Sequence, residues 1–173
     1  MDRILLYIFL TSSLFAREYI AIIDFEGINV SDGDAKALTQ RLTTEMIALE
    51  VYQILERSEM KRLLDEQKFQ YSGCVDTQCA IEVGKLLGAK YMVVGTVTKV
   101  GKTFAIDSRM LDVKTGESYT SAKYNYKGEI DKLLSVGMTS IAHQLSELED
   151  SKILQIDDDT DNEDEDDRDD EKD

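Results

Sequence analysis

The strongest pattern of hydrophobic positions lies at residues 91–100, where almost every second residue is β-branched or aromatic. This pattern predicts a strand, and we expect it to be central in its sheet. A second run, residues 19–25, is apolar at nearly every position, which is typical of a strand buried on both faces. Residues 26–30 are more polar and are expected to form a loop.

Four amphipathic helices are expected where apolar residues recur three and four positions apart. Three of them follow polar residues suited to N-caps, within residues 31–34, at Ser58 and at Asp76 or Thr77, and Gly88 is placed as a helix C-cap. The apolar positions that define the four helices are Leu38, Leu42, Met46, Leu49, Met60, Leu63, Leu64, Ala80, Val83, Leu87, Ile130, Leu133, Leu134, Met138, Ile141, Leu145 and Leu148.

The remaining segments complete an α/β pattern. A strand is expected at residues 51–56, and strands at 103–113 and 118–126 follow the central strand through tight turns as an antiparallel meander. The last helix, residues 130–148, is predicted to be the longest and to cover the sheet. The sequence therefore predicts a single-domain α/β sandwich with a mixed β-sheet, in the order β-α-β-α-α-β-β-β-α.

The N-terminus departs from this pattern. An apolar run at residues 4–15 follows Arg3 and precedes Ala16, which is typical of a secretory signal peptide cleaved after Ala16. The alternative is a buried first strand or helix. We expect a signal peptide at residues 1–16 and a folded domain at 17–150. No cysteine follows the run, so we expect no lipoprotein-type anchor and no transmembrane span in the mature chain.

The C-terminus carries most of the charge. Residues 157–173 contain 13 acidic and two basic residues, a net charge of −11 out of −15 for the whole chain. Neither part of the chain offers a basic stripe, so nucleic-acid binding is not expected. Residues 151–173 are predicted to form a disordered, solvating acidic tail. Weak cation binding and docking to a basic partner remain alternatives for this tail.

The two cysteines of the chain, Cys74 and Cys79, are close in sequence. In an oxidising compartment such a pair most often forms a disulfide, and the spacing then requires Cys74 in a loop and Cys79 at the start of a helix. Two free buried thiols are the alternative. Two thiolates and His143 do not make a four-ligand zinc set, so no metal or cofactor is predicted.

No catalytic constellation stands out. Asp24, Glu26, Asp107 and Asp112 are expected near strand ends, where active sites of open α/β sheets often lie, but no histidine or nucleophile accompanies them in sequence. We expect these carboxylates to end strands or to pair with cations. The prediction is therefore no enzyme and no catalytic residue, and an unrecognised hydrolase using Asp24 and Asp107 is the least favoured alternative.

Four segments, taken in order, carry a family pattern. They are IAIIDFEG at 20–27, YQILERSEMKRLLDEQ at 52–67, GCVDTQCAIEVGKLLGAKYMVVGTV at 73–97 and RMLDVKTGE at 109–117. Together they resemble the CsgG/HfaB family of the bacterial cell envelope, whose compact domain is similar to the amino-terminal domain of TolB and to LpoB. The resemblance covers residues 19–148.

The resemblance implies a non-enzymatic periplasmic accessory or scaffold protein that binds other envelope proteins, with an association with the outer membrane left open. The alternative is a subunit of a ring-like secretion or curli-type assembly, and hence a homo-oligomer. The secretion channel of this family is a lipoprotein that builds a transmembrane pore from long added hairpins. Here the turns between strands are tight and no lipobox cysteine is present, so we expect only the core of the domain. This favours an adaptor over a pore. Candidate partner contacts are Tyr71 in the cysteine loop and the aromatic pair Tyr124 and Tyr126.

Overall fold

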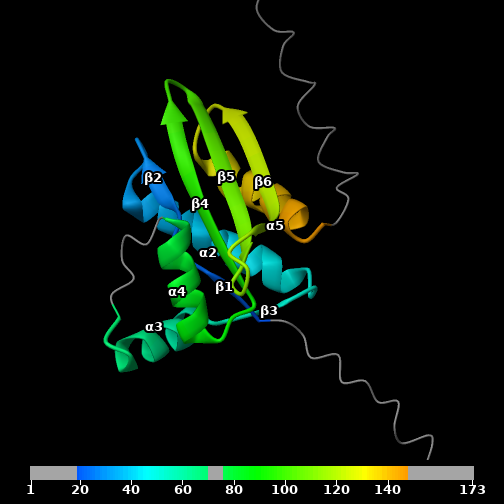
Figure 1. Ribbon diagram of the computed structural model, residues 1–173. Coiled ribbons are helices and arrows are strands. Elements are labelled where there is room, and N and C mark those ends of the chain that lie inside the picture. The colour runs from blue at the N-terminus through cyan, green and yellow to red at the C-terminus, as the bar shows by residue number, and fades with distance from the viewer. Residues whose placement is uncertain (1–18, 70–75, 148–173) are drawn as a thin grey trace, which may run out of the picture.

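The structure, a computed structural model, describes residues 19–69 and 76–147. Helices lie on both faces of a six-stranded mixed sheet with the order β3-β1-β4-β5-β6, and β2 also pairs with β4 (Figure 1). The predicted α/β fold with a mixed sheet is confirmed. The elements are β1 (Tyr19–Ile22), β2 (Glu26–Ile28), α2 (Asp32–Ala48), β3 (Gln53–Ile54), α3 (Arg57–Glu66), α4 (Thr77–Leu87), β4 (Tyr91–Val100), β5 (Thr103–Asp112), β6 (Ser118–Lys127), the π-helical turn η1 (Leu133–Gly137) and α5 (Met138–Leu145).

The predicted central strand is β4. It pairs in parallel with β1 and β2 on one side and antiparallel with β5 on the other, and β5 pairs antiparallel with β6. β1 is buried on both faces, as predicted: Ile20 and Ile22 belong to one core cluster, and Ala21 and Ile23 belong to a second cluster on the opposite face. The sheet therefore separates two hydrophobic cores.

Residues 26–30 do not form the predicted loop, because β2 occupies positions 26–28. Ile22 pairs with Val93 whereas Glu26 pairs with Thr96, so four steps along this chain match three steps along β4. The extra residue makes a bulge, after which the chain returns to the sheet. Glu26 is exposed and Ile28 is 42% exposed, so β2 lacks the apolar run that marks a fully buried strand.

The last helix is also shorter than predicted. The chain makes the π-helical turn η1 before α5, and the 17-residue α2 is the longest helix of the described residues. A π-turn inserts one residue into the helical repeat, so the buried stripe shifts in phase. Leu133 is buried, whereas Leu134, predicted on the same stripe, is 40% exposed. Leu148 lies outside the described residues.

Helix caps follow the sequence in two of three cases. The Ser31 hydroxyl accepts from the backbone N–H of Asp34 at 3.1 Å at the start of α2. The Asp76 carboxylate accepts from the backbone N–H of Cys79 at 2.8 Å at the start of α4, which ends at Gly88 in the left-handed region. The prediction of Ser58 was wrong: α3 begins after Glu56, which makes no side-chain capping bond.

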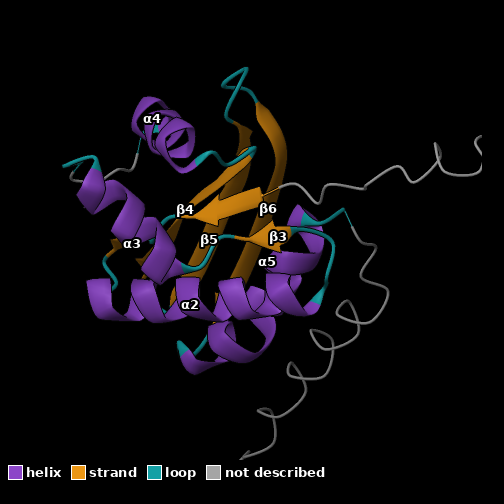
Figure 2. Cartoon of the chain, turned by 90° about the horizontal axis from the view of Figure 1, so that it is seen from below, coloured by secondary structure: helices purple, strands orange, loops and turns teal. Residues whose placement is uncertain are grey.

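The two helical layers differ in extent. α2 and α5 pack on one face of the sheet, and α3 and α4 pack on the other, as Figure 2 shows. The core under α2 and α5 extends from β1 across to Ala122 on β6, whereas the core under α3 and α4 ends on the sheet at Leu111 and Val113. Part of the second face is therefore left without a helix.

Candidate interaction surface

We call the uncovered part of this second face the open face (Figure 1). Every residue of the open face is exposed or partly exposed, whereas the alternate residues of β5 are buried under α5. Its members are Glu26 and Ile28 on β2, Thr96, Thr98 and Val100 on β4, Thr103, Ala105, Asp107 and Arg109 on β5, and Ser121, Lys123, Asn125 and Lys127 on β6.

A small hollow lies on the open face. It has a volume of about 140 Å³ and is lined by Val94, Gly95, Thr96, Asp107 and Arg109. It is too small to enclose a drug-sized ligand, for which pockets of about 300–1,000 Å³ are usual. It could hold a single polar side chain.

Arg109 differs from the other arginines of the described residues. Arg41 pairs with Glu45 at 2.7 Å, Arg57 pairs with Asp24, and Arg62 pairs with two glutamates of its own helix. Within residues 19–69 and 76–147, Arg109 pairs with no carboxylate. The open face therefore presents a planar cation that no carboxylate of the described residues neutralises.

The open face also carries exposed apolar residues at its edge. Val100 is 71% exposed at the end of β4, and Ile28 is 42% exposed on β2. Ile28 stands beside Thr98, which faces Ala105 on β5. Exposed apolar residues beside polar and cationic groups occur at many protein–protein contact surfaces.

The carboxylates expected at strand ends do not gather into one site. Asp24 forms an ion pair with Arg57, whereas Asp107 and Glu26 lie on the open face. Asp112 organises the turn after β5: its Oδ1 accepts from the backbone N–H of Lys114 at 2.8 Å and of Thr115 at 2.9 Å. The backbone hydrogen bond from Thr115 is the largest of the effects that lower the pKa of Asp112.

The predicted contact residues lie elsewhere. Tyr124 and Tyr126 are partly buried and pack against the core under α5, on the face opposite the open face. Tyr71 and Cys74 lie outside the described residues, so the disulfide between Cys74 and Cys79 stays a prediction. Arg109 was not singled out from the sequence as a candidate contact, although its place on the outer face of an alternating strand was a usable signal.

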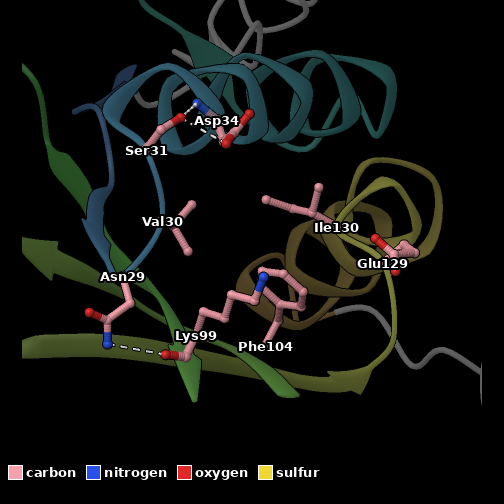
Figure 3. Close-up of a pocket in the computed structure, with 8 residues that line it drawn as sticks. All are labelled: Asn29, Val30, Ser31, Asp34, Lys99, Phe104, Glu129 and Ile130. Carbon is pink, nitrogen blue, oxygen red and sulfur yellow. Dashed lines mark hydrogen bonds between the residues drawn. The ribbon is translucent and has the colours of Figure 1, made fainter. Parts of the chain in front are cut away.

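A second pocket, of about 160 Å³, lies between the start of α2, the end of β4 and the segment before η1 (Figure 3). Its polar groups bind one another. The Ser31 hydroxyl donates to the Asp34 carboxylate at 2.7 Å, and the Asn29 amide donates to the Lys99 carbonyl at 3.2 Å. The Lys99 ammonium lies 5.0 Å from the centre of the Phe104 ring. These contacts hold the helix start against the sheet.

Parts of two of the four segments of the family pattern, residues 73–97 and 109–117, come together in space. Residues 77–85 of α4 and residues 113–116 of the turn after β5 line a groove of about 390 Å³. Glycines permit their close approach: a Cβ at Gly84 would lie 2.6 Å from Val113 Cγ2, and one at Gly116 would lie 3.1 Å from Ile81 Cδ1. These passages therefore position α4 on the sheet.

Comparison with known proteins gives the same family. Residues 19–104 match the family described as "Curli production assembly/transport component CsgG". The predicted resemblance to the CsgG family is confirmed. The CsgG match begins at β1 and ends just inside β5, so it includes the bulge, the α4 glycine and the central strand. No curated protein sequence matches the chain.

Solved structures share the fold at low sequence identity. The C-terminal domain of LpoB from Salmonella enterica is 13% identical, with a TM-score of 0.53, over 70% of this chain and 90% of that chain. Lipoprotein GNA1162 from Neisseria meningitidis is 13% identical, with a TM-score of 0.54, over 73% and 98%. A PelC dodecamer from Paraburkholderia phytofirmans is 16% identical, with a TM-score of 0.51, over 76% and 88%. At these identities the likeness establishes the fold alone.

None of the helices that the structure describes is both long enough and apolar enough to span a bilayer. Among the described residues, no group of three or more His, Cys, Asp or Glu side chains is arranged to hold a metal ion. The exposed cations and apolar residues of the open face make it the candidate site that the described geometry supports best.

Proposed function

We propose that this protein is a non-enzymatic accessory protein of the bacterial cell envelope that binds another envelope protein through its open face. The observation that carries the proposal is the match of residues 19–104 to the CsgG family, which is described as an assembly and transport component. The signal-like start at residues 1–16 supports a periplasmic location.

The chemistry of the open face supports its role as the contact surface. Arg109 is exposed beside a small hollow, and Val100 and Ile28 supply exposed apolar area on the same side of the sheet. Arginine is enriched among the residues that dominate binding energy at protein interfaces. The opposite face is covered by α2 and α5 and offers no comparable stretch of sheet.

The proposal is tested by crosslinking the tagged full chain in cells and identifying what it captures. We expect one dominant envelope protein with the wild type, and loss of that capture with Arg109→Glu or Val100→Asp. Lys61→Glu on α3 is the matched control, because Lys61 is exposed and lies outside the open face, and it should leave capture unchanged. Equal capture by all variants would place the contact elsewhere.

The non-enzymatic part of the proposal has its own test. Hydrolytic turnover by the purified protein that disappears in Asp107→Asn or Asp24→Asn would contradict it. We expect no such turnover, because Asp24 is held by Arg57 and Asp107 faces solvent on the open face.

A second candidate function is a subunit of a ring-like or curli-type assembly. The fold shared with PelC, whose solved structure is a dodecamer, is compatible with it. In that case crosslinking would yield a ladder of the protein with itself, and sedimentation would give a defined oligomer. A monomer at all concentrations would exclude this candidate.

A further inference from the structure

The charges on the β5 and β6 part of the open face are unbalanced. The eight positions that these two strands contribute include the cations Arg109, Lys123 and Lys127, against one carboxylate, Asp107. β6 itself contains no acidic residue. Within the described residues no ion pair reaches any of the three cations. This surface is therefore suited to an acidic segment.

The position at which the described chain ends is the second observation. The Gln144 side chain of α5 makes two hydrogen bonds to the edge of β6. Its Nε2 donates to the Lys123 carbonyl at 3.1 Å, and its Oε1 accepts from the Lys123 N–H at 3.1 Å, as the backbone of a neighbouring strand would. The described residues end at Glu147, three residues after this contact. The chain therefore continues from a point beside the cations of β6.

We infer that the acidic segment at residues 157–173 docks on the open face, across Arg109, Lys123 and Lys127. Nine residues lie between Glu147 and Asp157, and the ten steps from one Cα to the next can span up to about 33 Å. Arg109 stands one strand from β6 and two residues from the position opposite Lys123, about 5 Å across and about 7 Å along the sheet. The segment can therefore reach all three cations.

Tethering makes this contact effective although each ion pair is exposed. A segment held by a short linker binds its own domain at a high effective concentration. The segment carries a net charge of −11, so several of its carboxylates can take turns in pairing with the same cations. Salt screens exposed ion pairs, so the docked state weakens as ionic strength rises.

The consequence is regulation of the contact surface. The acidic segment covers the area that the proposed function assigns to the partner, so a partner must displace it. The inference rests on the proposed function in this respect alone. Purified protein without a partner tests it, so its failure would leave the proposed function standing.

The experiment is carbodiimide coupling of the purified full chain, which joins carboxylates to the lysine amines that they contact. We expect links from residues 157–173 to Lys123 and Lys127, within one molecule, and a lower yield in high salt. Lys36 on α2 and Lys61 on α3 are the matched controls, because both are exposed and lie away from the open face.

Arg109→Gln supplies the decisive variant. Removing one exposed ion pair should lower the yield of the Lys123 link about twofold to fivefold, with no change at Lys61. An even distribution of links over the control lysines would overturn the inference, as would links that form only between two molecules in a mixture of isotopically labelled and unlabelled protein. An unchanged yield in Arg109→Gln would also overturn it, provided circular dichroism shows that the variant is folded.

Discussion

Gly84 on α4 provides the sharpest test of the packing that positions this fold. Gly84 is buried, and a Cβ placed there would lie 2.6 Å from Val113 Cγ2 and 2.7 Å from Met92 Cγ. Both distances are far inside van der Waals contact. Val113 is β-branched and stiff, and the Met92 Cγ lies near its backbone, so neither neighbour can move without shifting the sheet.

The expected effect of Gly84→Ala is a net loss of stability. Inserting a methyl group into a packed core costs about 1–3 kcal/mol, and two contacts this short place the cost near the upper end. The better helix propensity of alanine offsets about 1 kcal/mol. The difference is a loss of about 1–2 kcal/mol, which lowers the melting temperature by roughly 4–8 °C for a domain of this size.

The assay is urea unfolding followed by circular dichroism, with Gly33→Ala as the matched control. Gly33 also lies in a helix, but a Cβ there would meet only the Ser31 hydroxyl oxygen, at 3.7 Å. The control should be neutral or more stable by up to about 1 kcal/mol. A Gly84→Ala protein at least as stable as the wild type would refute the packing argument.

Three further predictions follow from single contacts. Thr39→Val removes the hydroxyl that accepts from the buried N–H of Phe25 at 2.9 Å, so it should cost about 1–3 kcal/mol in urea unfolding, and a cost near zero would show that the N–H finds another partner. Gln144→Ala frees the edge of β6 at Lys123 and should produce concentration-dependent self-association in sedimentation, whereas a strictly monomeric variant would argue against an edge-protecting role. Asp112→Asn should lower the melting temperature at neutral pH, and because the folded pKa of Asp112 is lowered, its contribution is present above the ordinary carboxyl pKa and lost as pH falls through the folded value. The gap from wild type should close below about pH 4, and a gap independent of pH would contradict this origin.

Local patterns predicted the elements whose signals lie within a few neighbouring residues. The strand at 91–100 follows from its β-branched residues, and its observed bounds match the prediction. The caps at Ser31, Asp76 and Gly88 follow from side-chain and backbone chemistry that acts over three or four residues. The mixed order of strands and helices was sufficient to predict the fold class.

Two elements escaped the sequence because their cause is a contact across the sheet. β2 forms because a bulge returns the chain to β4. The residues of β2 itself contain little apolar side chain and give no strand signal. The π-turn before α5 places Gly137 against the sheet, where a Cβ would lie 3.2 Å from the Tyr124 ring. Neither constraint is visible in the spacing of nearby residues.

The candidate site shows the same division. By itself the sequence determined the family pattern, the central strand and the acidic segment at residues 157–173, because each is a property of consecutive residues. Only the tertiary structure decided that Arg109 and Lys123 share an uncovered face and that the partly buried Tyr124 packs on the other, because α4 covers only part of its side of the sheet. Strand pairing brings together residues that the sequence separates, and which of them remain exposed depends on how far the packed helices reach.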